Sequence, residues 1–146
     1  MAGLRVTGTG QVVEDMSSDT PRVLVIDDSK TIRKTAQNLL AKAGYEVRTA
    51  EDGFEALAVI VDFQPDLVFV DIMMPRLDGY HTCALIKSNP TLRHTPVVML
   101  SSKDGIFDRA KGRLVGAELH LSKPFTGDEL LDAVQRHLRK KSRGVG

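Results

Sequence analysis

The sequence predicts an α/β protein in which five helices cover a doubly wound, five-stranded parallel sheet. Two observations support this prediction. Short apolar runs of strand length alternate along the chain with longer segments whose apolar residues recur at helical spacing. The first run, Val23-Leu24-Val25-Ile26, is apolar throughout, which is typical of a strand covered by helices on both faces. Strand–helix repeats of this kind form a parallel sheet with right-handed crossovers.

The order of the elements follows from these patterns and from the residues that interrupt them. Apolar runs predict strands at residues 23–26, 45–50, 67–70, 97–100 and 118–121. Helical spacing predicts helices at residues 32–43, 54–61, 79–89, 106–115 and 130–138. A glycine or proline closes off four of these helices: Gly44, Pro65, Pro90 and Gly116. Phe54 and Phe63 are expected in the core.

The length of the chain indicates one domain with a short segment on either side. The chain has 146 residues, which suits a single core, and we place the domain at residues 21–139. Residues 1–20 are rich in Gly, Ser, Thr and Asp and are expected to be a flexible amino-terminal extension. Residues 140–146 are expected to be a basic flexible tail.

Charge and composition exclude several function classes. A formal net charge of +1 gives no overall attraction to nucleic acid or to an acidic membrane surface. No apolar stretch approaches the roughly 20 residues of a membrane helix, and the first residues lack the charged-then-apolar pattern of a secretory signal. The single cysteine, Cys83, allows no internal disulfide. We therefore expect a cytoplasmic protein that binds neither nucleic acid nor membranes.

Five polar residues stand where predicted strands end. They are Asp27, Asp28, Asp71, Ser101 and Lys123. Because the carboxyl ends of parallel strands share one edge of the sheet, and ligands bind at that edge, these side chains are expected to lie close together. Three carboxylates, a hydroxyl and an ammonium are the groups that magnesium-dependent phosphorylation of an aspartate requires.

The three carboxylates predict a cation site. Hard oxygen donors suit Mg²⁺, or Mn²⁺, rather than zinc. Taken alone, Asp27 and Asp28 fit a helix cap as well as a metal site, and Ser29 fits the cap too. Asp71 at a second strand end favours the metal site. Asp71 is also the candidate nucleophile, because a carboxylate can attack phosphorus to form an acyl phosphate.

Lys123 and Ser101 are the candidates for stabilising phosphoryl oxygens, through a positive charge and a hydroxyl donor. Pro124 and Phe125, which follow Lys123, predict a constrained turn. A cis Lys123–Pro124 bond, the isomer found at about 5–6% of X–Pro bonds, would direct the ammonium inward. A phosphoryl group on Asp71 is expected to attract Ser101 and Lys123 and to shift the loop after the fourth strand.

Taken together, the motifs resemble the receiver domains of two-component response regulators of the chemotaxis type. The matching segments are Val-Ile-Asp27-Asp28-Ser, Val-Asp71-Ile-Met-Met-Pro75-Arg-Leu-Asp78-Gly79, Met-Leu-Ser101-Ser102 and Leu-Ser-Lys123-Pro124-Phe125. The similarity extends from about residue 21 to residue 138. Within the family, the chain most resembles the single-domain regulators of chemotaxis-like systems that control type IV pilus twitching motility.

The resemblance implies the flavodoxin-like strand order 2-1-3-4-5 and phosphorylation of Asp71 by a histidine kinase of the chemotaxis type. It implies Mg²⁺ contacts from Asp28, Asp71 and the backbone carbonyl of Met73, with Asp27 acting mainly through water. It further implies that Lys123 pairs with the phosphoryl group.

The resemblance also implies how a signal leaves the domain. Ser101 is the switch hydroxyl, and His120 occupies a switch position where many members have Tyr or Phe. Histidine titrates near neutrality, which suggests pH-dependent signalling, although His120 also fits a half-exposed strand residue. The face formed by the fourth helix, fifth strand and fifth helix is expected to bind a downstream protein, such as a pilus motor or its regulator. We expect a phosphoacceptor rather than an enzyme, as a monomer or weak dimer.

Alternative functions make different demands on the sequence. A stand-alone receiver also suits flagellar chemotaxis or a phosphate sink. An aspartate-nucleophile phosphohydrolase commonly has a second acid two residues after the nucleophile, where this chain has Met73. A DNA-binding regulator would need an output domain, and only a short basic run follows Leu138. A flavin- or nucleotide-binding protein would need a glycine-rich loop where Asp27 and Asp28 stand.

Overall fold

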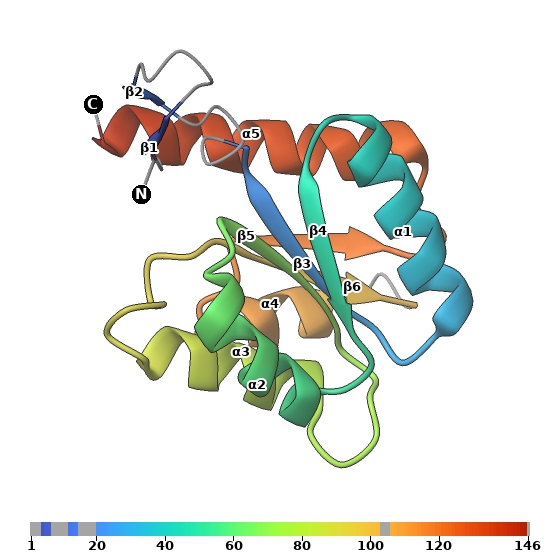
Figure 1. Cartoon of the computed structure of the whole chain (residues 1–146). Helices are drawn as coiled ribbons and strands as arrows, with labels where there is room; N and C mark the ends of the chain where they lie inside the picture. The colour runs from blue at the N-terminus through green and yellow to red at the C-terminus, as the bar shows by residue number, and fades with distance from the viewer. Residues whose placement is uncertain (1–3, 7–11, 15–19, 103–105, 146) are drawn as a thin grey trace.

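A five-stranded parallel sheet forms the centre of the computed structural model, which describes residues 4–6, 12–14, 20–102 and 106–145. The strands are β3 (Arg22–Ile26), β4 (Glu46–Ala50), β5 (Leu67–Asp71), β6 (Val97–Ser101) and β7 (Leu119–Ser122). They lie in the order β4-β3-β5-β6-β7 (Figure 1). When the five strands of this sheet are numbered 1 to 5 along the chain, this order is 2-1-3-4-5. The predicted sheet and its topology are therefore confirmed.

Each strand of this sheet is followed by a helix. The helices are α1 (Lys30–Lys42), α2 (Gly53–Phe63), α3 (Gly79–Ser88), α4 (Ile106–Leu114) and α5 (Gly127–Val145). Helices α1 and α5 cover one face of the sheet, and α2, α3 and α4 cover the other (Figure 1). The prediction of a doubly wound sheet with five helices is confirmed.

The sheet separates two hydrophobic cores. Alternate strand residues face α2, α3 and α4, among them Leu24, Ile26, Val68, Val70 and Met99. Their neighbours face α1 and α5, among them Val23, Val25, Leu67, Phe69, Val98 and Leu100. All of these side chains are fully buried. Burial on both faces explains why the strand sequences are continuously apolar rather than alternating.

One expected core residue lies at the surface. Phe63 is buried, but Phe54 exposes 54% of its surface, so the prediction for Phe54 is wrong. Ala56 and Ile60 provide the buried face of α2. Phe54 precedes Ala56 by two residues and therefore lies on the opposite side of the helix.

The amino ends of the helices are capped by side chains. Ser29, Asp52 and Asp78 are the N-caps of α1, α2 and α3. At the start of α5, the Glu129 N–H donates to Thr126 Oγ1 at 3.0 Å and the Thr126 N–H donates to Glu129 Oε1 at 2.9 Å. This reciprocal pair is a capping box. The caps fix the helix starts next to the strand ends, where the predicted site lies.

Regular secondary structure is also present in the two segments outside the predicted domain. Within residues 1–20, β1 (Leu4–Val6) and β2 (Val12–Glu14) form an antiparallel pair. Helix α5 continues to Val145, beyond the predicted boundary at residue 139. Lysine and arginine are good helix formers and are favourable near a helix carboxyl end, which accounts for this continuation. The flexibility of both segments stays a prediction.

Within the described residues, the helices are too short or too polar to cross a membrane.

A half-buried lysine joins three segments at the edge of the sheet opposite the predicted site. Lys87, near the end of α3, donates from Nζ to the Thr95 carbonyl at 2.7 Å and to Glu118 Oε1 at 2.6 Å. The other carboxylate oxygen of Glu118 accepts a hydrogen bond from the Val97 N–H at 2.6 Å. These bonds join the end of α3, the start of β6 and the segment between α4 and β7.

Candidate metal and phosphoryl-acceptor site

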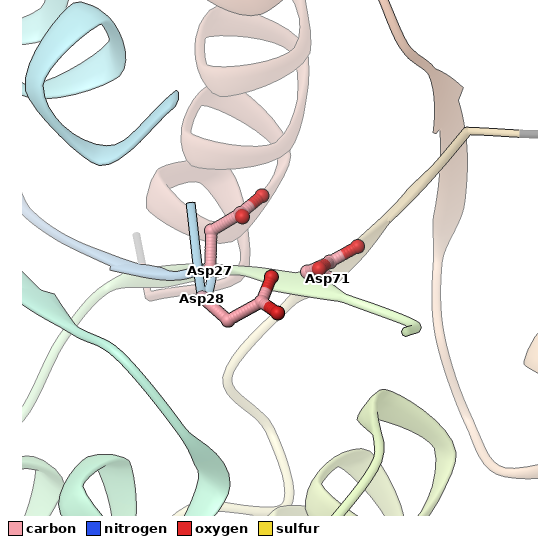
Figure 2. Close-up of side chains that lie close together, drawn as sticks. All are labelled: Asp27, Asp28 and Asp71. Atoms are coloured by element: carbon pink, nitrogen blue, oxygen red, sulfur yellow. The ribbon is translucent and has the colours of Figure 1, made fainter. Parts of the chain in front are cut away.

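Three aspartates from two adjacent strands converge at the carboxyl edge of the sheet. Asp27 and Asp28 directly follow β3, and Asp71 is the last residue of β5, which pairs with β3. One carboxylate oxygen from each lies within 4.8 Å of the others, and the three side chains gather on one side of the strand ends (Figure 2). This set of oxygen donors fits a single hard divalent cation.

Lys123 joins two of these carboxylates. Its Nζ lies 2.8 Å from Asp27 Oδ2 and 3.1 Å from Asp71 Oδ1. Asp27 is fully buried and Asp71 is 3% exposed, whereas Asp28 is exposed. The Lys123–Pro124 peptide bond is cis. The ammonium thus balances two carboxylates that are removed from water, an arrangement that is costly to form without such a partner.

The electrostatics of the cluster disfavour the charged form of Asp71 relative to an isolated aspartate. Burial, together with the negative charge of Asp27, raises the pKa of Asp71 to about 6, against the opposing effect of Lys123. Burial disfavours the charged form of Lys123. Nevertheless, hydrogen bonds and attraction from Asp27 and Asp71 raise the pKa of Lys123 above its ordinary value. A bound cation would favour the charged form of Asp71.

The turn after β3 holds Asp27 from two sides. Asp27 Oδ1 accepts a hydrogen bond from the Ser29 N–H at 2.9 Å, and the Asp27 carbonyl accepts one from Arg33 Nη1 at 2.6 Å. Ser29 itself caps α1, accepting from the Ile32 N–H at 3.3 Å. Ser29 rather than the acid pair therefore caps this helix. The sequence patterns did not single out Arg33, because only its position one turn into α1 relates it to Asp27.

The loop between β5 and α3 forms a cleft with Asp28. A cavity of about 530 Å³ is lined by Asp28, by residues 72–75 and by Asp78, Tyr80 and Lys111. The Met73 side chain is 71% exposed. Met73 thus lies in the cleft where the resemblance places its carbonyl as a ligand; that role stays a prediction.

Gly79 is required for the close approach of α3 to Asp71. The Gly79 N–H donates to the Ile72 carbonyl at 2.9 Å. A Cβ at Gly79 would overlap the Asp71 carbonyl oxygen and lie 2.8 Å from Ile72 Cα. The sequence showed this glycine only as part of a motif, because a contact between the start of a helix and the preceding strand has no local pattern.

Ser101 and His120 lie in different surroundings. Ser101 ends β6, is 3% exposed, and directly follows Leu100, the register partner of Asp71. Its carbonyl accepts a hydrogen bond from the Lys123 N–H at 2.6 Å, which joins the ends of β6 and β7. His120 is half-buried in β7 opposite Met99 and lines a cavity of about 420 Å³ beside α4. The acids and Lys123 therefore meet at the strand ends, and Ser101 ends the adjoining strand, whereas His120 lines a different cavity.

Comparisons with known proteins agree with this geometry. The family model described as "Response regulator receiver domain" matches residues 23–135. The chain belongs to the response regulator receiver family. This receiver is 61% identical over 124 residues to Protein PilG of Pseudomonas aeruginosa, covering 85% of this chain and 92% of PilG. It is 39% identical over 125 residues to response regulator MprA of Mycobacterium sp. (strain KMS), covering 86% of this chain and 54% of MprA.

Solved receiver structures have the same fold. The chemotaxis protein CheY4 of Vibrio cholerae superposes with a TM-score of 0.78 at 36% identity, covering 80% of this receiver and 98% of CheY4. The receiver domain of the Francisella response regulator 1452 gives a TM-score of 0.78 at 33% identity, covering 84% and 99% of the two chains. The predicted family, fold and receiver function are confirmed. Family membership implies a cognate histidine kinase, and the acid triad is typical of receiver magnesium sites.

Proposed function

We propose that this receiver is a phosphorylation-activated signalling switch in which Asp71 accepts a phosphoryl group from a histidine kinase. One observation carries the proposal. The Asp71 carboxylate lies 3.1 Å from the Lys123 ammonium and within 4.8 Å of two further carboxylates. A nucleophile, a set of cation ligands and a fixed positive charge at one point are what phosphoryl transfer to a carboxylate requires.

Each residue of the site has its own role in the transfer of the phosphoryl group. A carboxylate oxygen of Asp71 forms a bond to phosphorus while the N–P bond of the kinase phosphohistidine breaks, and the imidazole nitrogen leaves with the electron pair. Mg²⁺ or Mn²⁺, held by Asp28, Asp71 and the Met73 carbonyl and by Asp27 through water, would supply charge that offsets the phosphoryl oxygens. Lys123 exchanges its contact with the Asp71 carboxylate for one with the phosphoryl group, and the Ser101 hydroxyl donates a hydrogen bond to the same group.

The new charge then changes the output face. A phosphoryl group adds roughly −1.5 to −2 charge near neutral pH. Because the Lys123 N–H is bonded to the Ser101 carbonyl, attraction of either residue moves the ends of β6 and β7 together. These strand ends adjoin α4 and α5. The proposed output is altered binding of a downstream protein at the α4–β7–α5 face, where His120 lies next to α4.

The relatives favour one biological setting. Similarity to PilG extends over 92% of that protein, and the motifs favour a chemotaxis-like system that controls type IV pilus twitching motility. The downstream target in that setting is a pilus motor or its regulator. Complementation of a strain that lacks its pilus-system receiver tests this assignment. The chain is expected to restore twitching and the Asp71→Asn variant is not; restored flagellar chemotaxis with no effect on twitching would favour the alternative setting.

Mass spectrometry tests the phosphoryl acceptor directly. The chain is incubated with Mg²⁺ and acetyl phosphate, and the labile adduct is located. We expect the adduct on Asp71, its loss in Asp71→Asn, and its retention in Asp62→Asn, which changes an exposed aspartate of α2 in the same way. An adduct on a different residue, or none, would overturn the proposal.

The lifetime of the adduct separates a switch from a phosphohydrolase. Met73, two residues after Asp71, cannot transfer protons, so rapid turnover lacks a general acid and base at that position. We expect the phosphoaspartate to persist for seconds or longer after the donor is removed. Steady release of phosphate with no detectable adduct would favour the hydrolase instead.

A further inference from the structure

A second ion pair lies beside the acid triad, between two loops at the same edge of the sheet. Asp52 follows β4 and caps α2, its Oδ1 accepting a hydrogen bond from the Glu55 N–H at 2.8 Å. Its Oδ2 lies 2.5 Å from Nη2 of Arg76. Arg76 belongs to residues 72–78, the loop between β5 and α3. Asp52 is buried, whereas 68% of the Arg76 side chain is exposed.

The same two segments pack against each other at further points. The Arg76 guanidinium carbon lies 5.8 Å from the centre of the Phe54 ring, within the range of a cation–π contact. At Gly53, an added Cβ would lie 2.6 Å from Leu77 Cδ2 and would overlap Thr82 Oγ1. The start of α2 and the β5–α3 loop are therefore in close contact, with the ion pair at the middle of the loop.

The backbone of Arg76 has an uncommon conformation for a residue with a side chain. Arg76 has a φ of 68°, in the left-handed region that non-glycine residues rarely adopt. Glycine adopts this conformation freely. An arginine here adopts a costly backbone conformation, and its side chain contacts Asp52 and Phe54.

The loop that contains Arg76 lines the same cavity as Asp28 of the acid triad. Met73, Met74 and Pro75 line this cavity together with Asp28. The two ends of the loop are fixed, by β5 at Asp71 and by the close approach of Gly79. Between these ends, Arg76 provides an ion pair to a different part of the fold.

We propose that Asp52 and Arg76 are positioning residues that hold the β5–α3 loop so that the Met73 carbonyl completes the divalent-cation site. The inference rests on the proposed function, because it assigns the loop to the same site. Neither residue needs to touch the ion. Their effect on ion binding passes through the position of the loop backbone.

Whether Arg76 variants bind the cation more tightly or less tightly distinguishes a positioning role from a purely electrostatic one. Removing the positive charge of Arg76 from the surroundings of three carboxylates strengthens cation binding if charge alone matters. Positioning predicts the opposite, weaker binding, because the carbonyl ligand is no longer held. Neutralising Asp52 weakens binding under both explanations. Variants at Arg76 are therefore decisive.

The experiment measures Mg²⁺ affinity by calorimetry on the full chain and three Arg76 variants. Arg76→Ala removes the ion pair, and Arg76→Gly removes it while relieving the left-handed backbone. Arg76→Lys keeps the charge on a shorter donor. We expect roughly tenfold weaker binding for Ala and Gly, as for other residues that orient metal ligands, and partial recovery for Lys. Arg136→Ala, which breaks an exposed Arg136–Asp132 pair on α5, is the matched control and should leave affinity unchanged.

Two further measurements distinguish an effect on the ion site from an effect on folding. Urea unfolding reports stability: Arg76→Gly is expected to remain folded, so its loss of affinity cannot be attributed to unfolding. Amide NMR reports the loop: Mg²⁺ should shift the Met73 and Met74 signals in the unaltered chain and shift them less in Arg76→Gly. Unchanged or tighter Mg²⁺ binding by Arg76→Ala and Arg76→Gly would overturn the inference. Failure of the unaltered chain to bind Mg²⁺ would instead overturn the proposed function.

Discussion

At the scale of single residues, the protonation of Asp71 links the site to the stability of the fold. The pKa of Asp71 is raised to about 6 from 3.8, so the folded chain binds a proton more readily than the unfolded chain between these values. Stability conferred by that proton is complete at low pH and is lost as the pH rises through about 6. Without a cation, charged Asp71 therefore opposes folding at neutral pH.

Replacement of this carboxylate should stabilise the metal-free protein. We expect Asp71→Asn to raise the free energy of unfolding by about 1–3 kcal/mol at pH 7.5 in EDTA, because the variant removes a buried negative charge beside Asp27. The gain should shrink as the pH falls through 6 and disappear near pH 4. Urea titrations across this range measure it. An equal gain at every pH would show that the charge of Asp71 is not its cause.

The opposite effect is expected at Lys123. Lys123→Met leaves the buried carboxylates of Asp27 and Asp71 without their shared cation, and breaking such a buried pair typically destabilises a protein by about 3 kcal/mol. We expect a loss of this order in EDTA and partial recovery with Mg²⁺. Lys34→Met, at an exposed lysine of α1, is the control. A variant as stable as the control would contradict the role of Lys123 as the balancing charge.

At the scale of elements, the junction between β5 and α3 depends on a residue without a side chain. Gly79 lets the first turn of α3 lie against the backbone of Asp71 and Ile72. The neighbouring contacts are backbone atoms, which cannot move aside as a flexible side chain would. A side chain here therefore displaces the nucleophile or the helix.

Two glycine-to-alanine variants test this junction. Gly79→Ala is expected to destabilise the fold by about 1–3 kcal/mol through overpacking and to weaken Mg²⁺ binding. Gly112→Ala, within α4, places its Cβ at an ordinary 3.6 Å from Met99 Cγ and should stabilise the helix by about 0.5–1 kcal/mol. Unfolding and calorimetry measure both. Similar effects in the two variants would indicate that helix propensity, rather than the close approach, governs Gly79.

The elements also show which features the sequence could predict. The strands and the residues at their ends, such as Asp28 and Asp71, follow from local patterns, because parallel strands bring their carboxyl ends to one edge. Asp52 and Arg76 lie in two different loops and are 24 residues apart in the sequence. The sequence of neither loop indicates that the other loop is its partner. The prediction for Phe54 was wrong because nearly every position of α2 is apolar. Which face of α2 is buried therefore depends on how the helix packs against the sheet.

At the scale of the whole molecule, the acid triad couples cation binding to folding. A ligand that binds only the folded chain stabilises it by about 2.7 kcal/mol at one hundred times its dissociation constant. We expect the thermal midpoint to rise with Mg²⁺ concentration, and to rise less at pH 5, where protons compete for Asp71. Calorimetric scans measure this shift. Asp28→Asn should largely abolish it and Asp62→Asn should not; an equal rise in all three proteins would locate the ion elsewhere.

The hydrogen bonds of Lys87 and Glu118, at the edge of the sheet opposite the acid triad, hold one end of α4 more firmly than the other. Lys87 and Glu118 tie the backbone that follows α4 to α3 and to the start of β6. A rotation of α4 that moved its carboxyl end would have to break these bonds. We therefore expect the carboxyl-terminal end of α4 to stay in place when the strand ends near Ser101 move. Motion that starts near Ser101 is greatest at the opposite, amino-terminal end.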